Sequence, residues 1–218
     1  TIGLLESDLE TADKLHRDVE EARNLGIEVL QPDVNKSKLM FGIEEKDGKK
    51  CIRFGMGGIK TINRKVVEKI ITERDKNGPF KHFDDLVGRV GITDLTKKTL
   101  EVLIETGALD AFGSRTQLLT IMPTVWNKYT RLKDERNQES LFGDSKVMGE
   151  SASLLPNIEK ETDKQKLVWE RELLGTFFSN HPLRNYTYLI DNEKILSINK
   201  ALEGELNKPV LLLVILKE

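Results

Sequence analysis

The sequence is poor in the residues that cross-link a protein, bind metals or enter membranes. Cys51 is the only cysteine among 218 residues, so no disulfide can form within the chain, and a reducing cytoplasm is the expected location. The three histidines, His16, His82 and His181, lie far apart, and none has a second ligand at metal-binding spacing. The one long apolar run, residues 210–216, is far shorter than the roughly 20 residues of a membrane span. The sequence therefore predicts a cytoplasmic protein with no metal centre and no membrane partner.

A strong charge of one sign is also lacking, because 34 basic and 36 acidic residues give a net charge of −2. The distribution is uneven. Residues 49–136 hold 18 Lys and Arg against 11 Asp and Glu, whereas the rest of the chain holds 16 against 25. A locally basic segment of this kind attracts a polyanion such as nucleic acid. With 38% hydrophobic residues, the chain can also bury a substantial core.

Apolar periodicity predicts a mainly α fold with a small β element. A short strand is expected at 27–30, and strands at 39–44 and 50–54 flank the hairpin signal Asp47-Gly48. Asn63 and Ser114 are expected to cap helices. Residues 137–163 have little periodicity, which predicts a linker, and residues 210–216 predict a buried strand. Helical spacing covers residues 8–25, 64–75, 82–89, 95–106, 114–134 and 163–175.

Residues 52–119 contain two helix–turn–helix units in tandem, with bends centred near Asn63 and Leu109. A tight turn before a helix directs backbone N–H groups and the helix N-terminus outward, where they can bind a phosphate. We therefore expect both bends to hold the backbone of a nucleic acid without reading its sequence. The candidate contacts are Lys60, Thr61, Ile62, Asn63, Arg64 and Lys65 at the first bend, and Lys97, Lys98, Ser114 and Arg115 around the second.

Each candidate also has a purely structural interpretation. In this interpretation the first bend packs two helices together and binds no ligand. Lys97 and Lys98 then belong to an ordinary solvated face. The adjacent pair Asp84-Asp85 is expected at a helix N-terminus, where acidic side chains interact favourably with the helix dipole. Metal binding is less favoured, because a two-metal site needs more carboxylates from separate elements. Several large apolar side chains are expected in the core and not at a ligand, namely Leu109, Phe112, Trp126, Tyr129 and Trp169.

Several blocks, in order and spacing, resemble the α subunit of bacterial replicative DNA polymerase III, and together they cover essentially the whole chain. SDLETADKL and EARNLGIEVLQPDVNKS are similar to the end of that family's fingers domain. IRFGMGGIK, VVEKIITER, GPFKHFDDL and LIETGALDAFGSRTQLL are similar to its tandem helix-hairpin-helix domain, and WERELLGTFFSNHPL to the segment leading into its OB-fold. The resemblance implies the end of the fingers over 1–36, a β hairpin with the tandem domain over 37–136, a linker with a clamp-binding motif over 137–163, a helical connector over 164–206 and the first strand of a truncated OB-fold over 207–218.

The resemblance implies a non-catalytic fragment of a DNA-directed DNA polymerase, a nucleotidyltransferase. The family's palm carboxylates precede the fingers and are not in this chain, so no catalytic residue, metal or cofactor is expected here, and Mg²⁺ belongs to the parent polymerase. The implied partners are double-stranded template–primer DNA, the bacterial sliding clamp and, through the parent chain, other replicase subunits. The motif QESLF occupies the place of the family's internal clamp motif, with Gln138, Leu141 and Phe142 as the implied clamp contacts.

The first bend departs from the family pattern, which usually has glycine at the positions of Thr61 and Asn63. Glycine there permits a positive φ and a close approach of the backbone to phosphate. Asparagine tolerates that conformation moderately well, whereas a β-branched threonine does so poorly.

The alternative function is a free-standing helix-hairpin-helix adaptor that binds DNA in repair. The gene sequence flanking Thr1 and Glu218 distinguishes the two hypotheses, because the adaptor needs a start and a stop codon close by. An enzyme acting by itself has no support in the sequence, since no carboxylate constellation, phosphate-binding glycine loop or activated nucleophile is present.

Overall fold

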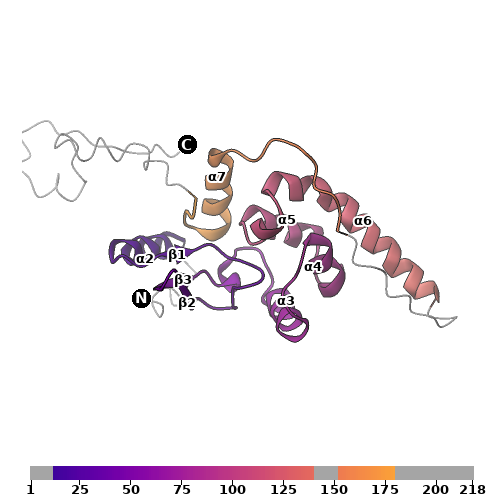
Figure 1. Cartoon of the computed structure of the whole chain (residues 1–218), viewed down its shortest axis with the longest axis horizontal. Coiled ribbons are helices and arrows are strands. Elements are labelled where there is room, and N and C mark those ends of the chain that lie inside the picture. The colour runs from indigo at the N-terminus through magenta and orange to yellow at the C-terminus, as the bar shows by residue number, and fades with distance from the viewer. Residues whose placement is uncertain (1–11, 140–151, 180–218) are drawn as a thin grey trace, which may run out of the picture. The chain divides into compact units, whose positions relative to one another are not determined.

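The computed structural model describes residues 12–139 and 152–179, and every element named below lies within them (Figure 1). The chain divides into two compact units, Thr1–Phe178 and Ser179–Glu218, and all of these elements belong to the first unit. The predicted OB-fold strand over 207–218 and residues 180–206 of the predicted connector lie outside the described residues.

A small β layer forms in the N-terminal part of the chain. Its three strands have the order β1-β3-β2: β1 (Val29–Leu30) runs parallel to β3 (Lys49–Arg53), and β2 (Gly42–Lys46) runs antiparallel to β3. The turn between β2 and β3 is Asp47-Gly48, with φ angles of 52° and 73° that a two-residue hairpin loop requires. The predicted hairpin is therefore confirmed. α2 (Ala12–Asn24) precedes β1 and ends close to Gly26, as its helical spacing predicts.

The other regular elements described in the first unit are helices. The first half of the tandem consists of η1 (Met56–Gly58) and α3 (Arg64–Asn77). The second half consists of α4 (Phe83–Val90), α5 (Lys97–Glu105), η2 (Asp110–Phe112) and α6 (Arg115–Glu139), and α7 (Asp163–Leu174) follows. Side chains of Asn63, Thr96 and Thr162 cap α3, α5 and α7. The predicted mainly α fold with a small β element is confirmed.

One hydrophobic core joins the β layer to the helices. Phe54, just after β3, and Met56 of η1 enter it with no exposed surface. Ile70, Leu100 and Leu118 enter it from α3, α5 and α6, also with no exposed surface. Complete burial of a side chain of this size contributes about 1.5–3 kcal/mol. This shared core fixes the positions of α3, α5 and α6 relative to one another.

Residues 152–162 form neither helix nor strand, yet they pack on the helices, and we call them the strap (Figure 1). The backbone N and Oγ of Ser153 each donate to the carboxylate of Asp84 at 2.9 Å. Further along, Nε2 of Gln117 donates to the carbonyl oxygen of Pro156 at 2.9 Å. This part of the predicted linker is therefore held in place by α4 and α6.

Asp84 anchors the strap. Its side chain is 1% exposed, and Nζ of Lys128 donates to it at 2.9 Å. Burial alone would raise the pKa of Asp84, but the bonds from Ser153 and Lys128 outweigh burial and lower it. Its neighbour Asp85 accepts a hydrogen bond from the Lys81 amide at 2.9 Å, which is consistent with the predicted role at the start of a helix.

Candidate nucleic-acid interface

The first bend joins η1 to α3 and lies at the surface. Ile59 is 3% exposed and Ile62 packs against the core, so these two side chains anchor the bend. Lys60 between them is exposed, and its amide donates to the carbonyl oxygen of Leu173 at 2.9 Å. The C-terminal end of α7 therefore holds this bend from one side. Ile62, which was expected among the DNA contacts, instead serves as a core anchor.

Thr61 occupies the left-handed region of the backbone map, with φ of 68°. This is a conformation that glycine accepts easily and that a β-branched residue accepts only with strain. The bend thus adopts left-handed geometry with a threonine at this position. Its exposed side chain lies beside Lys60 in the turn.

Asn63 does not need a positive φ, because its φ is −70°. Its side-chain oxygen accepts a hydrogen bond from the Lys65 amide at 2.9 Å, and it is the N-cap of α3, as predicted. Arg64 and Lys65 are exposed in the first turn of α3, and Nε of Arg64 donates to Glu68 at 2.9 Å. The first bend therefore presents basic side chains at the N-terminal end of a helix.

The second predicted bend, centred near Leu109, is buried, and the prediction that it presents an outward edge is wrong. Leu109 is 0% exposed and Ala108 is 1% exposed. The carbonyl oxygen of Ala108 accepts a hydrogen bond from the Val34 amide at 2.9 Å, and that of Gly107 accepts one from Nε2 of Gln31 at 3.4 Å. The segment between β1 and β2 thus covers the bend, and the apolar residues of the bend fill the core.

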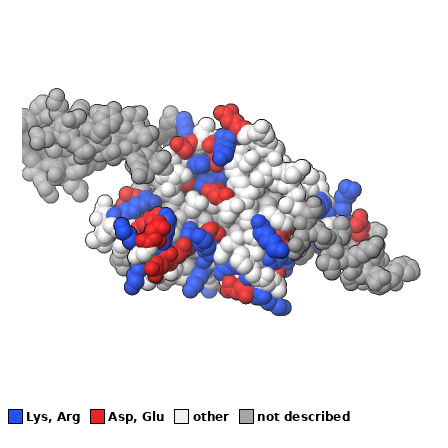
Figure 2. All heavy atoms as spheres, viewed as in Figure 1, with Lys and Arg blue, Asp and Glu red and all other residues white. Residues whose placement is uncertain are grey.

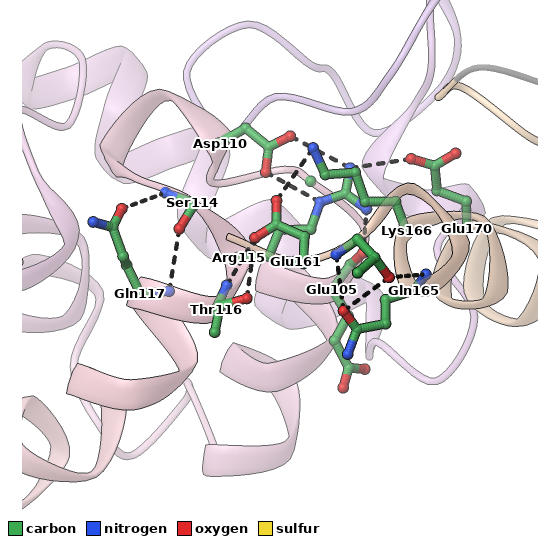
Figure 3. Close-up of polar contacts among 12 residues, drawn as sticks. Glu105, Asp110, Ser114, Arg115, Thr116, Gln117, Glu161, Gln165, Lys166 and Glu170 are labelled. Carbon is green, nitrogen blue, oxygen red and sulfur yellow. Dashed lines mark hydrogen bonds and ion pairs between the residues drawn. The ribbon is translucent and has the colours of Figure 1, made fainter. Parts of the chain in front are cut away.

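Arg115 was also expected to face outward, and this expectation is wrong because its side chain is 1% exposed (Figure 3). Its guanidinium donates to the Glu105 carbonyl at 2.9 Å, to both carboxylate oxygens of Asp110 at 3.3 Å and to Glu170 of α7 at 3.1 Å. A planar fork of five donors suits this set of internal acceptors. Arg115 therefore joins the second bend to α7 and does not reach a phosphate.

The N-terminus of α6 already has an anion, which is the carboxylate of Glu161 from the strap (Figure 3). Its Oε2 accepts from the Thr116 amide at 3.0 Å and from the Thr116 hydroxyl at 3.2 Å. Burial alone would raise the pKa of Glu161, but the bonds from Thr116 and from Lys166 lower it, so the group is ionised at neutral pH. Ser114 and Gln117 exchange hydrogen bonds in a capping box. A phosphate has no place at this helix end.

The exposed turn in the second half of the tandem lies between α4 and α5. Thr93, Thr96, Lys97 and Lys98 are exposed there, and Thr96 caps α5 by accepting from the Thr99 amide at 3.1 Å. The amides of the first turn of a helix have no partner inside the helix, so this N-terminus is suited to an anion. Lys97 and Lys98 lie at the surface as expected, and Nζ of Lys98 is 3.5 Å from Glu101.

Two further lysines meet at this turn. Nζ of Lys69 from α3 pairs with Asp94, and Nζ of Lys133 from α6 donates to Oγ1 of Thr93 at 3.2 Å. The turn therefore gathers cations from three helices. We define the basic surface as Arg64, Lys65 and Lys69 of α3, Lys97 and Lys98 of α5, and Lys133 of α6.

Sequence reasoning missed Lys69 and Lys133. Lys69 lies four residues after Lys65 and hence on the same face of α3, so its helical spacing could have identified it. Lys133 could not be found in this way, because only the packing of α6 on α4 brings it to Thr93. On the face shown in Figure 2, basic and acidic side chains are interleaved, so the binding of an anion depends on local arrangement and not on one large field.

Other expected sites can be placed only in part. Gln138 belongs to the last turn of α6, which extends to Glu139 and so beyond the predicted end at 134, whereas Leu141 and Phe142 lie outside the described residues. Within residues 12–139 and 152–179, no group of three or more His, Cys, Asp or Glu side chains could hold a metal ion. In the same residues, no helix has the length and apolar character needed to cross a membrane.

Comparison with known proteins agrees with this architecture. The family described as a helix-hairpin-helix motif matches residues 26–118, a range that contains both exposed turns. DNA polymerase III subunit alpha of Campylobacter jejuni is 33% identical over 188 residues, which cover 84% of this chain. The same subunit of Xylella fastidiosa is 36% identical over 186 residues, or 84% of the chain, and that of Mycobacterium leprae is 34% identical over 207 residues, or 93%. This chain belongs to the DNA polymerase III alpha-subunit family.

The match spans only part of each relative. It covers 16% of the Campylobacter jejuni subunit, 15% of the Xylella fastidiosa subunit and 17% of the Mycobacterium leprae subunit. The features shared with the DNA polymerase III alpha subunits are therefore those of one segment, which contains the helix-hairpin-helix match.

In this alpha-subunit segment, replacement of Thr61 by glycine is predicted to raise the free energy of unfolding by about 1 kcal/mol, because it removes the left-handed strain. Chemical denaturation followed by circular dichroism measures the change. The matched control is Lys60→Gly in the same turn, which has no positive φ and is expected to lose about 0.5–1 kcal/mol. A Thr61→Gly protein no more stable than the wild type would show that the bend carries no strain.

Proposed function

We propose that this chain binds the sugar–phosphate backbone of double-stranded DNA through the basic surface, as part of a DNA-directed DNA polymerase. The observation that carries the proposal is the meeting of three helices at one exposed turn, where Lys69 pairs with Asp94 and Lys133 contacts Thr93. Two comparisons support the same function: residues 26–118 match the helix-hairpin-helix motif, and the chain is similar to alpha subunits of a DNA polymerase.

The chemistry of the basic surface favours phosphate over base edges. Five of its six side chains are lysines, which act as point charges and carry no sequence information in contact with phosphate. Three carboxylates, Glu68, Asp94 and Glu101, pair with the six cations of the basic surface. An excess of positive charge is therefore left for a polyanion. The N-termini of α3 and α5 add backbone amides. We therefore propose binding that is indifferent to sequence and sensitive to salt.

Duplex binding is tested with the double variant Lys65→Gln/Lys69→Gln. Its log–log salt dependence is expected to be shallower than that of the wild type by about 0.9 for each lysine that contacts a phosphate. Fluorescence anisotropy on two duplexes of unrelated sequence, at several salt concentrations, gives the slope, and the affinities for the two duplexes are expected to be equal.

The matched control for this test is Lys160→Gln/Lys164→Gln, which removes the same charge from exposed lysines at the end of the strap and the start of α7. It is expected to leave the slope unchanged. An equal change of the salt-dependence slope in the two double variants would mean that net charge alone drives binding. A strong preference for one duplex would contradict recognition of the DNA backbone.

We further propose that Gln138, Leu141 and Phe142 dock the chain on the bacterial sliding clamp. What supports this is the resemblance of QESLF to the family's clamp motif and its position at the C-terminal end of α6, which begins after the second bend. Two apolar anchors with a polar neighbour are the usual content of a small docking motif. In this proposal α6 links the DNA-binding turns to the clamp, while nucleotidyl transfer and its Mg²⁺ belong to residues outside this chain.

Clamp docking is tested by capture of the full chain on immobilised clamp. Leu141→Ala/Phe142→Ala is expected to abolish capture, because it removes both apolar anchors. The control is Leu154→Ala/Val168→Ala, which truncates two apolar side chains that are 92% and 46% exposed. Capture of the motif variant at the level of the control would remove this assignment and leave the DNA proposal standing.

A further inference from the structure

A cavity of about 270 Å³ opens beside the edge strand β2, among residues that the basic surface does not use. Its lining comes from the segment before β2, from β2 and from the end of β3, and consists of Lys36, Lys38, Gly42, Ile43, Glu44 and Arg53. Three of these six residues are cations and one is a carboxylate. Such a lining attracts an anion and repels a metal ion.

The two lysines of the cavity are held on a fixed stretch of backbone. Ser37 between them is 0% exposed, and its Oγ donates to the carbonyl oxygen of Phe54 at 2.8 Å. Its own carbonyl oxygen accepts from Nη1 of Arg74 at 2.7 Å. Because the residue between Lys36 and Lys38 is fixed in this way, the backbone that carries both lysines is set before any ligand binds. Lys38 forms no ion pair within the described residues.

Arg53 and Glu44 both line the cavity and form an ion pair with each other. Nε and Nη2 of Arg53 donate to the two carboxylate oxygens of Glu44 at 2.8 and 2.9 Å, and Nη1 donates to the carbonyl oxygen of Gln31 at 2.7 Å. The hydrogen bonds from Arg53 lower the pKa of Glu44, so this carboxylate stays ionised and offsets the charge of its partner. Lys36, with Nζ at 4.0 Å from Glu44, and Lys38 then supply the excess positive charge.

The cavity also has open space and an apolar rim. A Cβ added to Gly42 would meet only Cδ of Lys38, at 4.0 Å, so nothing fills the space above the strand at this position. Ile43 next to it is 69% exposed. Cations beside an exposed apolar side chain match a phosphate that carries a sugar and a base, better than a bare inorganic ion.

We propose that this cavity, lined by Lys36, Lys38, Gly42 and Arg53, is a second anion site that binds the phosphate of a nucleotide. The phosphate can belong to a free nucleoside triphosphate or to a strand of single-stranded DNA, and the chemistry of the contact is the same in both cases. The site shares no residue with the basic surface, so it stands or falls independently of the duplex-binding function.

The test is an NMR titration of the full chain with dATP and, separately, with a single-stranded oligothymidylate. Amide shifts of Gly42, Ile43 and Arg53 are expected to change with at least one ligand. Lys36→Gln/Lys38→Gln is expected to weaken that binding at least about tenfold, the scale of losing one or more charge-assisted hydrogen bonds. Gly42→Val keeps every charge and fills the open space with a residue favoured in strands, so it is expected to weaken binding to a similar extent.

Two controls make the outcome specific. Lys49→Gln/Lys50→Gln removes two exposed lysines of β3 that do not line the cavity, and it is expected to bind as the wild type does. Lys65→Gln/Lys69→Gln is expected to weaken duplex binding while the shifts at Gly42 persist. Higher affinity for dATP assigns the site to a free nucleotide, and higher affinity for the oligonucleotide assigns it to single-stranded DNA. No shift at these amides with either ligand at millimolar concentration, or equal affinity in all variants, would overturn the proposal.

Discussion

The ion pair between Arg115 and Glu170 is the contact on which the rest of the arrangement depends. The two side chains are 1% and 0% exposed, and their atoms approach to 3.1 Å. Breaking such a pair by removing one partner costs about 3–5 kcal/mol, because a charge is then left buried without compensation. Since Arg115 also binds Asp110 and the Glu105 carbonyl, a single side chain joins α7 to the buried bend between α5 and α6.

This internal arrangement determines which parts of the surface are left for a ligand. Glu161 occupies the N-terminus of α6, and the segment after β1 covers the bend at Leu109. The end of α7 in turn holds the Lys60 amide, so the first bend is fixed but its basic residues stay exposed. Exposed basic side chains are therefore left on α3 and at the turn between α4 and α5, in a chain whose net charge is −2.

Local signals in the sequence identified the elements well. Asp47-Gly48 marked the hairpin, and Asn63 marked the start of α3, because turn and cap chemistry involve neighbours in sequence. The burial of the Arg115 side chain could not be predicted in the same way. An arginine after a serine at a helix start has the same local pattern whether it faces solvent or a carboxylate from a distant helix, and Glu170 is 55 residues away in sequence. The strap was likewise predicted as a linker, because its anchors on Asp84 and Gln117 are contacts with other elements.

The central claim is that duplex DNA is held by the basic surface and not by the bend at Leu109. Lysine acetylation footprinting of the full chain, with and without duplex DNA, tests it most directly, because all of the relevant lysines are exposed in the free chain. The account predicts protection of Lys65, Lys69, Lys97, Lys98 and Lys133 on addition of DNA, with Lys160 and Lys164 modified as before. Protection confined to Lys160 and Lys164, which flank the segment bound to α6, with the five lysines of the basic surface unchanged, would contradict it.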